Sequence, residues 1–285
     1  MRIPLCTAVL ILVAAAVSPC SPRTETVAAP KGPPVIQPRA HSHNDYEHAR
    51  PLLDALAYGF CSVEADIYLV DGELLVAHDR SAVDTRRTLD NLYLRPLWER
   101  FQANGGHIYP LGGPPHRPED AGVTLLIDIK NSGAETFRVL DRKLADYAAM
   151  LTTFTNDTTT PGAVTVIISG DRANEVILAS SPRRAGIDGR LSDLDGPLNR
   201  HQVPLISDNW TLHFSWMGQK DVPADEAAKL SAILAKAHER GVRVRFWNIP
   251  QTAAVWSRLY DAGVDLLNAD HLGGLSAVLL KKSGR

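Results

Sequence analysis

From residue 36 onward, the sequence alternates short apolar runs with longer amphipathic runs, and this alternation limits the possible folds most strongly. The short runs have the length and composition of buried strands, whereas the longer runs have the apolar spacing of helices. The predicted strands are residues 35–41, 62–69, 74–78, 123–129, 164–169, 186–190, 205–207, 242–247 and 265–268. The predicted helices are residues 51–58, 89–103, 135–151, 172–179, 224–240, 253–261 and 271–281.

Near-continuous apolar strands joined by helices are typical of a parallel sheet that helices cover on both faces. About eight strand–helix units over roughly 250 residues favour a closed (β/α)8 barrel, in a regular or irregular form, over an open sheet. No glycine-rich dinucleotide-binding turn follows the first predicted strand, which also counts against the open sheet. The sequence therefore predicts one α/β domain, a TIM-type barrel over residues 36–285.

The first 35 residues differ from the rest and are predicted to lie outside the barrel. A positive start, an apolar stretch from Leu5 to Val17 and a break at Pro19 are typical of a secretory signal peptide, here residues 1–20. Cys20 stands where a bacterial lipoprotein carries its acylated cysteine, so simple cleavage and lipid anchoring both stay open. Residues 21–35 have the composition of a flexible tether. We therefore expect a secreted protein, either free or anchored through Cys20 to the outer face of the membrane.

The charge composition narrows the choice of partners. The net charge is −2, 22% of the residues are charged, and no long run of like charges occurs. Nucleic-acid binding would favour a basic patch or stripe, so no nucleic-acid partner is expected. A small-molecule or lipid substrate is expected instead. Association with a membrane surface stays open, and we expect a monomer.

Polar side chains with catalytic potential stand in or directly after the predicted strands. In a TIM-type barrel the carboxyl ends of the strands meet at one face, and this face holds the active site. The candidates are His41, His43, Asn44, Glu64, Asp66, His78, Asp128, Lys130, Arg172 and Trp247. Their regular placement predicts a functional site at that end of the barrel.

The acidic candidates point to a cation. Glu64 and Asp66 are two residues apart in a strand, so both point to one face, about 6.5–7 Å apart along it. Two carboxylates aimed together suit a hard cation such as Ca²⁺ or Mg²⁺. Asp128 lies between two isoleucines and could face the same interior. A lone buried carboxylate there is costly unless it is paired or bound to a metal.

The basic candidates suit proton transfer and phosphate binding. Histidines beside a cation site are the usual proton-transfer groups, and of His41 and His43 only one need act together with His78. Lys130 shares a strand face with Asp128. It is either the salt-bridge partner of that carboxylate or a cation that binds phosphate.

Three further candidates would contact the substrate. Arg172 follows a predicted strand and could help Lys130 to hold phosphoryl oxygens. Trp247 either packs in the core or stacks against a substrate headgroup. Asn44 either fixes the loop after the first strand or binds substrate.

The chain also carries the motifs HSHNDY, SVEADI, VAHD, LLIDIK, SDNW and VDLLNAD, spread over residues 36–280. They resemble the phospholipase-C-like phosphodiesterase superfamily, and within it the branch named for the yeast altered-inheritance-of-mitochondria 6 protein. The resemblance implies a TIM barrel with one Ca²⁺ or Mg²⁺, bound by Glu64, Asp66 and Asp128. It also implies an acid/base pair formed by His78 and one N-terminal histidine, with the choice between His41 and His43 open.

The activity that this resemblance implies is hydrolysis of a phosphodiester, such as a glycerophosphodiester or a phospholipid headgroup. The His-Arg-Gly motif of the glycerophosphodiester phosphodiesterases is absent, so the substrate alcohol stays open. Two alternatives remain. One is an amidohydrolase-type barrel in which His41 and His43 bind zinc and Asp270 is the base. The other is an inactive secreted barrel that acts as a binding protein.

Overall fold

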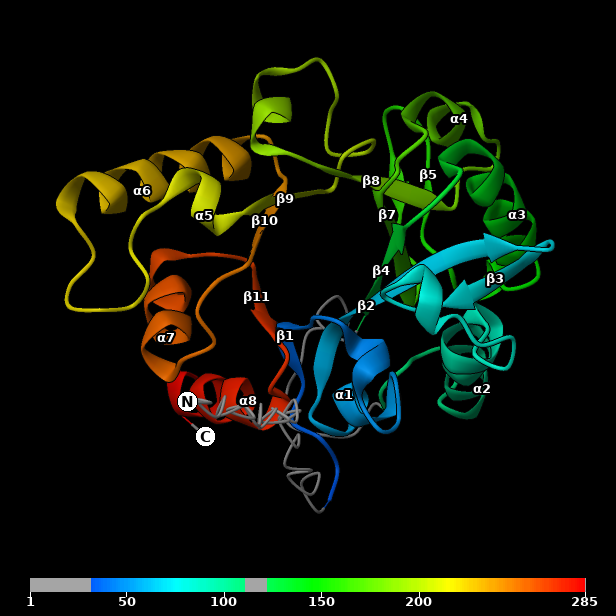
Figure 1. The fold of residues 1–285 in the computed structure, drawn as a ribbon, viewed down its shortest axis with the longest axis horizontal. Coiled ribbons are helices and arrows are strands. Elements are labelled where there is room, and N and C mark those ends of the chain that lie inside the picture. The colour runs from blue at the N-terminus through cyan, green and yellow to red at the C-terminus, as the bar shows by residue number, and fades with distance from the viewer. Residues whose placement is uncertain (1–31, 111–121, 285) are drawn as a thin grey trace, which may run out of the picture.

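The computed structural model describes residues 32–110 and 122–284, and Figure 1 shows their arrangement. The predicted signal peptide, Cys20 and the predicted tether up to residue 31 lie outside these residues. Within the described part of the chain, no helix combines the length and the apolar character needed to cross a bilayer.

Eight parallel strands form a closed ring, which confirms the predicted TIM-type barrel. The ring closes because the first strand pairs with both the second and the last strand. The barrel strands are β1 (Gln37–Ser42), β2 (Phe60–Val70), β4 (Val123–Ile129), β7 (Val164–Gly170), β8 (Ala185–Gly189), β9 (Leu205–Asn209), β10 (Arg243–Trp247) and β11 (Leu266–Ala269).

Helices surround the ring of strands and cover its outer face (Figure 1). Each barrel helix presents its buried side chains to the sheet and its polar side chains to solvent. The helices are α1 (Leu53–Ala57), α2 (Arg95–Ala103), α3 (Gly133–Ala145), α4 (Asn174–Ala179), α5 (Trp210–His213), α6 (Ala224–Glu239), α7 (Ala253–Ala262) and α8 (Leu272–Lys282).

A hairpin extends the second barrel strand beyond the ring. Strand β3 (Glu73–Val76) runs antiparallel to the outer half of β2, and the turn at Asp71 and Gly72 has the positive φ angles of a tight hairpin turn. After β3, the backbone N–H of Ala77 donates to the carbonyl of Asp66 at 3.2 Å. The hairpin therefore returns the chain to the level of Asp66 at the carboxyl end of the barrel.

The largest difference from the predicted elements concerns the helix predicted over residues 135–151. The observed helix α3 ends at Ala145, and a separate 3-10 turn, Ala148–Met150, follows. The chain leaves the helix there because Met150 is fully buried and Leu151 forms a bridge with Val164 of β7. Tertiary packing thus overrides the helical pattern at this point.

Smaller differences concern short elements. The region predicted as one helix over residues 89–103 begins with a π-helical turn, Asp90–Leu94, before α2. The sequence did not predict α5 or the hairpin formed by β5 (Thr153–Phe154) and β6 (Thr159–Thr160). Such runs of two to four residues are too short to show a period.

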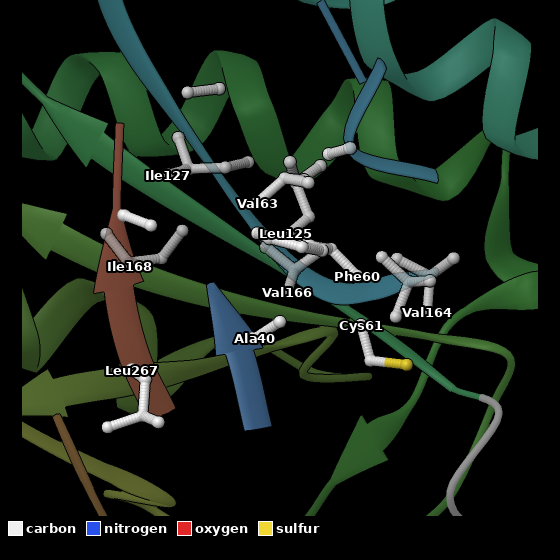
Figure 2. Packing of buried hydrophobic residues seen from close by; sticks show 14 of the residues in the cluster. Ala40, Phe60, Cys61, Val63, Leu125, Ile127, Val164, Val166, Ile168 and Leu267 are labelled. Carbon is white, nitrogen blue, oxygen red and sulfur yellow. The ribbon is translucent and has the colours of Figure 1, made fainter. Parts of the chain in front are cut away.

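The strands bury side chains on both faces. On the outer face, Val63, Leu125 and Ile127 belong to the large core under the helices, and Figure 2 shows them packed with neighbouring strands. Inside the barrel, four side chains form a separate apolar cluster: Leu126, Ile167, Leu205 and Leu266.

The register of β2 and β4 places charged residues directly above this inner cluster. Glu64 pairs with Leu126, and Asp66 pairs with Asp128, two residues farther along both strands. Residues i and i+2 of a strand share one face, so Asp128 lies on the same inner wall as Leu126. The barrel interior therefore changes from apolar to acidic over about 7 Å toward the carboxyl ends of the strands.

Replacement of Leu266 by alanine should destabilise the barrel, because this side chain is 1% exposed within the small inner cluster. We expect the free energy of unfolding in urea to fall by about 2–5 kcal/mol. Leu212→Ala is the control, since Leu212 is 73% exposed, and should change stability by less than about 0.5 kcal/mol. Equal losses in both variants would contradict the assignment of the inner cluster as core.

Candidate active site

Three carboxylates from two neighbouring strands converge at the carboxyl end of the barrel. Glu64 and Asp66 lie on β2, and Asp128 lies on β4. One oxygen of each lies within 4.8 Å of the others, and residues 32–110 and 122–284 contain no other cluster of three potential metal ligands. The structure thus brings together the three acids that the resemblance implies as ligands.

Two cationic side chains partly neutralise this cluster. The ammonium of Lys130 lies 2.8 Å from Asp66 Oδ2 and 3.1 Å from Asp128 Oδ1. The buried guanidinium of Arg245, on β10, donates to Glu64 Oε2 at 3.1 Å. Lys130 is therefore the salt-bridge partner of both aspartates, whereas its phosphate-binding role stays a prediction.

Each carboxylate keeps one oxygen available. All polar side-chain contacts of Glu64 with described residues use Oε2, those of Asp66 use Oδ2, and that of Asp128 uses Oδ1. One oxygen of each side chain therefore has no hydrogen-bond donor in the described part of the chain. Three such oxygens on acids that lie close together fit a hard divalent cation.

The local environment gives the three carboxyl groups different pKa values. Burial raises the pKa of Asp128 to about 6, although Lys130 opposes the shift. Burial and the charge of Glu64 raise the pKa of Asp66. Burial also acts to raise the pKa of Glu64, but the charge of Arg245 and the nearby histidines hold it below its usual range. Glu64 is therefore ionised at neutral pH, whereas Asp128 loses its proton close to neutrality.

His43 is oriented by a carboxylate that directly follows the last barrel strand, β11. Its Nδ1 lies 2.6 Å from Asp270 Oδ1, and its Nε2 lies 3.8 Å from Glu64 Oε2. The side chain is 23% exposed, so solvent and substrate can reach it. A carboxylate at Nδ1 favours the tautomer with a proton on that nitrogen, which leaves Nε2 free to accept a proton.

His41, the other N-terminal candidate, is fully enclosed. Its Nδ1 lies 2.7 Å from the hydroxyl of Ser62, and its Nε2 lies 3.6 Å from Glu64 Oε2. Burial, assisted by the charge of Arg245, lowers the pKa of His41 to about 3, so the ring is neutral. Its 0% exposure contrasts with the accessible ring of His43.

His78 lies on the other side of the carboxylates, just after β3. Its Nδ1 lies 3.0 Å from Asp66 Oδ2 and 2.9 Å from the hydroxyl of Tyr46, and its side chain is 53% exposed. Tyr46 also donates to Asp66 Oδ2 at 2.8 Å. Burial and the charge of Asp66 raise the pKa of Tyr46, which stays a neutral donor. His78 thus resembles His43 in having its Nδ1 beside a carboxylate.

Asn44 belongs to the loop that links the two histidine environments. Its backbone adopts a left-handed conformation with φ 48°, and its N–H approaches Glu64 Oε2 at 3.5 Å. Its side-chain oxygen lies 2.7 Å from the hydroxyl oxygen of Tyr46. These contacts give Asn44 a role in fixing the loop, one of its two sequence-based roles.

The remaining two predicted residues lie on other strands of the same barrel face. Arg172 follows β7, and its guanidinium donates to the backbone carbonyl of Asp188 on β8. Trp247 ends β10 and is half-buried. Neither makes a hydrogen bond or ion pair with the three clustered carboxylates.

The sequence did not identify Tyr46 and Arg245 as site residues, and it named Asp270 only in another role. Tyr46 lies within the HSHNDY motif, so its position in the motif was the available signal. Arg245 alternates with apolar residues in β10, and this pattern shows a strand face but names no partner. Asp270 entered only as the base of the zinc alternative.

The zinc alternative requires additional histidines near His41 and His43. His213 lies on α5, 3.2 Å from Asp208, and His201 lies 2.8 Å from a threonine of β6. Among the described residues, the one cluster of three potential ligands contains no histidine. The donor set therefore suits an oxygen-ligated cation better than zinc.

Comparison with known proteins agrees with this geometry. The protein-family model of the AIM6-like phosphodiesterase domain matches residues 33–187 of this chain. Altered inheritance of mitochondria protein 6 of Eremothecium gossypii is 31% identical over 294 residues, which cover 90% of this chain and 73% of that protein. A homologue from Arthroderma benhamiae is 30% identical over 259 residues, which cover 81% of this chain and 80% of that protein.

A solved structure has a related fold. It is a protein from Silicibacter pomeroyi described as a glycerophosphoryl diester phosphodiesterase, with a TM-score of 0.50 and 14% identity. The match covers 88% of this chain and 95% of that one. The family match spans more than half of the 285 residues, and the sequence relatives extend it over most of the chain. The chain therefore belongs to the family of AIM6-like phosphodiesterase domains.

Proposed function

We propose that this protein hydrolyses phosphodiesters with the help of one divalent cation, Ca²⁺ or Mg²⁺. The observation that carries the proposal is the cluster of Glu64, Asp66 and Asp128, in which each acid keeps one oxygen available. An accessible imidazole stands on either side of this cluster. Glycerophosphodiesters and phospholipid headgroups are the substrates that agree with the family and the related fold.

The three acids would hold the cation, and oxygen ligands favour Ca²⁺ or Mg²⁺ over softer metals. When bound, the cation supplies positive charge to a non-bridging phosphate oxygen. Lys130 binds the phosphoryl oxygens from the same side, because its ammonium already lies between Asp66 and Asp128. Arg172 is assigned to the same substrate face from the end of β7.

The two accessible histidines transfer the protons. One ring removes a proton from the nucleophile, which is water or a substrate hydroxyl beside the phosphate, and the other protonates the leaving oxygen. We assign these tasks to His43 and His78, because both rings reach solvent and both have Nδ1 beside a carboxylate. His41 acts as a positioning group for Glu64. Trp247 is assigned to the substrate headgroup, whereas Asn44 fixes the loop after β1.

We also propose that the chain is exported. The support is the apolar stretch from Leu5 to Val17, followed by Cys20. The mass of the exported chain distinguishes simple cleavage from acylation at Cys20, and retention of residues 1–20 in the cytoplasm would refute export.

Asp66→Asn should lower the turnover of bis(p-nitrophenyl) phosphate by about 100-fold or more at any concentration of Ca²⁺ or Mg²⁺, since a ligand and the partner of His78 are both lost. The matched control is Asp84→Asn, in the loop after His78, because Asp84 pairs only with Arg86 among the described residues. Undiminished turnover in the Asp66 variant, with folding verified by circular dichroism, would end the proposed mechanism.

His43→Asn and His78→Ala should each lower kcat by about 10²–10⁴-fold, because each removes a proton-transfer group. His238→Gln is the control, since His238 pairs with Asp265 on another part of the barrel. Steady-state kinetics on the same chromogenic diester measure the effect. The assignment fails if the His43 variant keeps the activity of the His238 control.

The affinity for Ca²⁺ should fall as the pH drops through about 6. Burial raises the pKa of Asp128 to about 6, so below this pH the carboxyl is protonated and cannot bind a cation. Calorimetric titration between pH 8 and pH 5 should show constant affinity above pH 7 and a loss of about tenfold per pH unit below 6. Constant affinity over the whole range would contradict the assignment of Asp128 as a ligand.

A further inference from the structure

Two guanidinium groups lie together at the ends of adjacent barrel strands. Arg172 follows β7, and Arg190 follows β8. The Nη1 atoms of both side chains donate to the same acceptor, the backbone carbonyl oxygen of Asp188, and the bond from Arg190 measures 3.3 Å. Because both bonds end on one oxygen, the two guanidinium groups are held next to each other.

This anchoring leaves most of the donors free. Arg190 Nη1 also contacts Asp188 Oδ2 at 3.0 Å and the carbonyls of Gly189 and Ser207 at 3.0 and 3.4 Å. Every hydrogen bond of the two guanidinium groups to described residues thus uses Nη1, and Nε and Nη2 of both have none. None of these nitrogens is among the buried atoms without a partner, so solvent reaches them. A planar fork of free N–H groups matches a carboxylate or a phosphate.

The pair borders the carboxylate cluster without belonging to it. Gly170 ends β7 with φ +71°, and a Cβ atom at this position would collide with Asp128 Oδ1. The backbone just before Arg172 therefore passes directly against Asp128. The N–H of Arg172 then donates to the carbonyl of Gly170 at 2.9 Å, which fixes the start of the loop beside the cluster.

The acids beside the two guanidinium groups also accept hydrogen bonds from neutral donors. Asp188 Oδ2 pairs with Arg190 but also accepts the hydroxyl of Ser169 at 2.8 Å, and Asp193 Oδ2 accepts the backbone N–H of Arg190 at 2.7 Å. Burial and the charge of Arg190 lower the pKa of Arg172 in spite of the acids around it. A further anion would relieve the repulsion between the two guanidinium groups.

We propose that Arg172 and Arg190 bind a second anionic group of the substrate, a carboxylate or a phosphate monoester on the alcohol beside the scissile phosphodiester. This inference rests on the proposed function and narrows its substrate class. Lys130 and the three carboxylates would handle the reacting phosphate, and Arg172 would lie between the two anionic groups. The preferred substrates would then be diesters whose alcohol carries an acidic substituent.

Three p-nitrophenyl phosphodiesters test this preference for an acidic substituent. Their second alcohol is glycerol, glycerol 3-phosphate or glyceric acid. The wild-type protein should show a KM about tenfold lower for at least one acidic diester than for the glycerol diester. The difference between the two acidic diesters identifies phosphate or carboxylate as the preferred group. In Arg190→Met, the ratio of the KM values should fall to about one. Arg184→Met, just before the opposite end of β8, should keep the wild-type ratio.

Binding without turnover separates this inference from the proposed function. In EDTA, calorimetry should show that the wild-type protein binds glycerol 1,3-bisphosphate about tenfold more tightly than glycerol 3-phosphate, and that Arg190→Met loses this difference. The same difference without turnover of any diester would refute the proposed hydrolysis and support the anion site. Turnover with equal KM values for all three diesters, or, in the absence of turnover, equal binding of both ligands by the wild-type protein, would overturn the anion site.

Discussion

The burial of several like charges at one end of the barrel is the constraint on which the rest of the site depends. Three carboxylates lie within 4.8 Å of one another, and only two cationic side chains, Lys130 and Arg245, pair with them in the described residues. The cluster therefore keeps a negative charge in a partly dry environment, which is costly without a further cation. The buried apolar cluster below it offers no polar group to solvate this charge.

The same charge organises the histidines around it. His41 is enclosed and neutral beside Glu64, whereas His43 and His78 reach solvent and each point Nδ1 at an acid. Three rings of one residue type thus have two different environments, because their exposure differs although each lies near a carboxylate. For the same reason a sequence motif with two histidines two residues apart cannot show which of them is accessible.

The sequence allowed the barrel and the shared face of Glu64 and Asp66 to be predicted, because strand faces follow a period of two. The inclusion of Asp128 in the same set came from the family resemblance. It could not show pairings that only the closed barrel creates. Arg245 reaches Glu64 across 181 residues of sequence, and Asp270 reaches His43 across 227. The end of α3 was mispredicted for a related reason, since the burial of Met150 is a tertiary effect.

The hairpin of β2 and β3 holds Asp66 and His78 together on one short piece of chain. Asp66 and His78 face each other because the antiparallel register and the bond from Ala77 to Asp66 fix their separation. Lengthening both arms equally at the tip, between Val70 and Glu73, would leave that separation unchanged. Insertions at the tip would therefore change how far the hairpin extends without moving Asp66 or His78. An insertion of an odd number of residues within one arm would instead turn His78 to the opposite face of the hairpin.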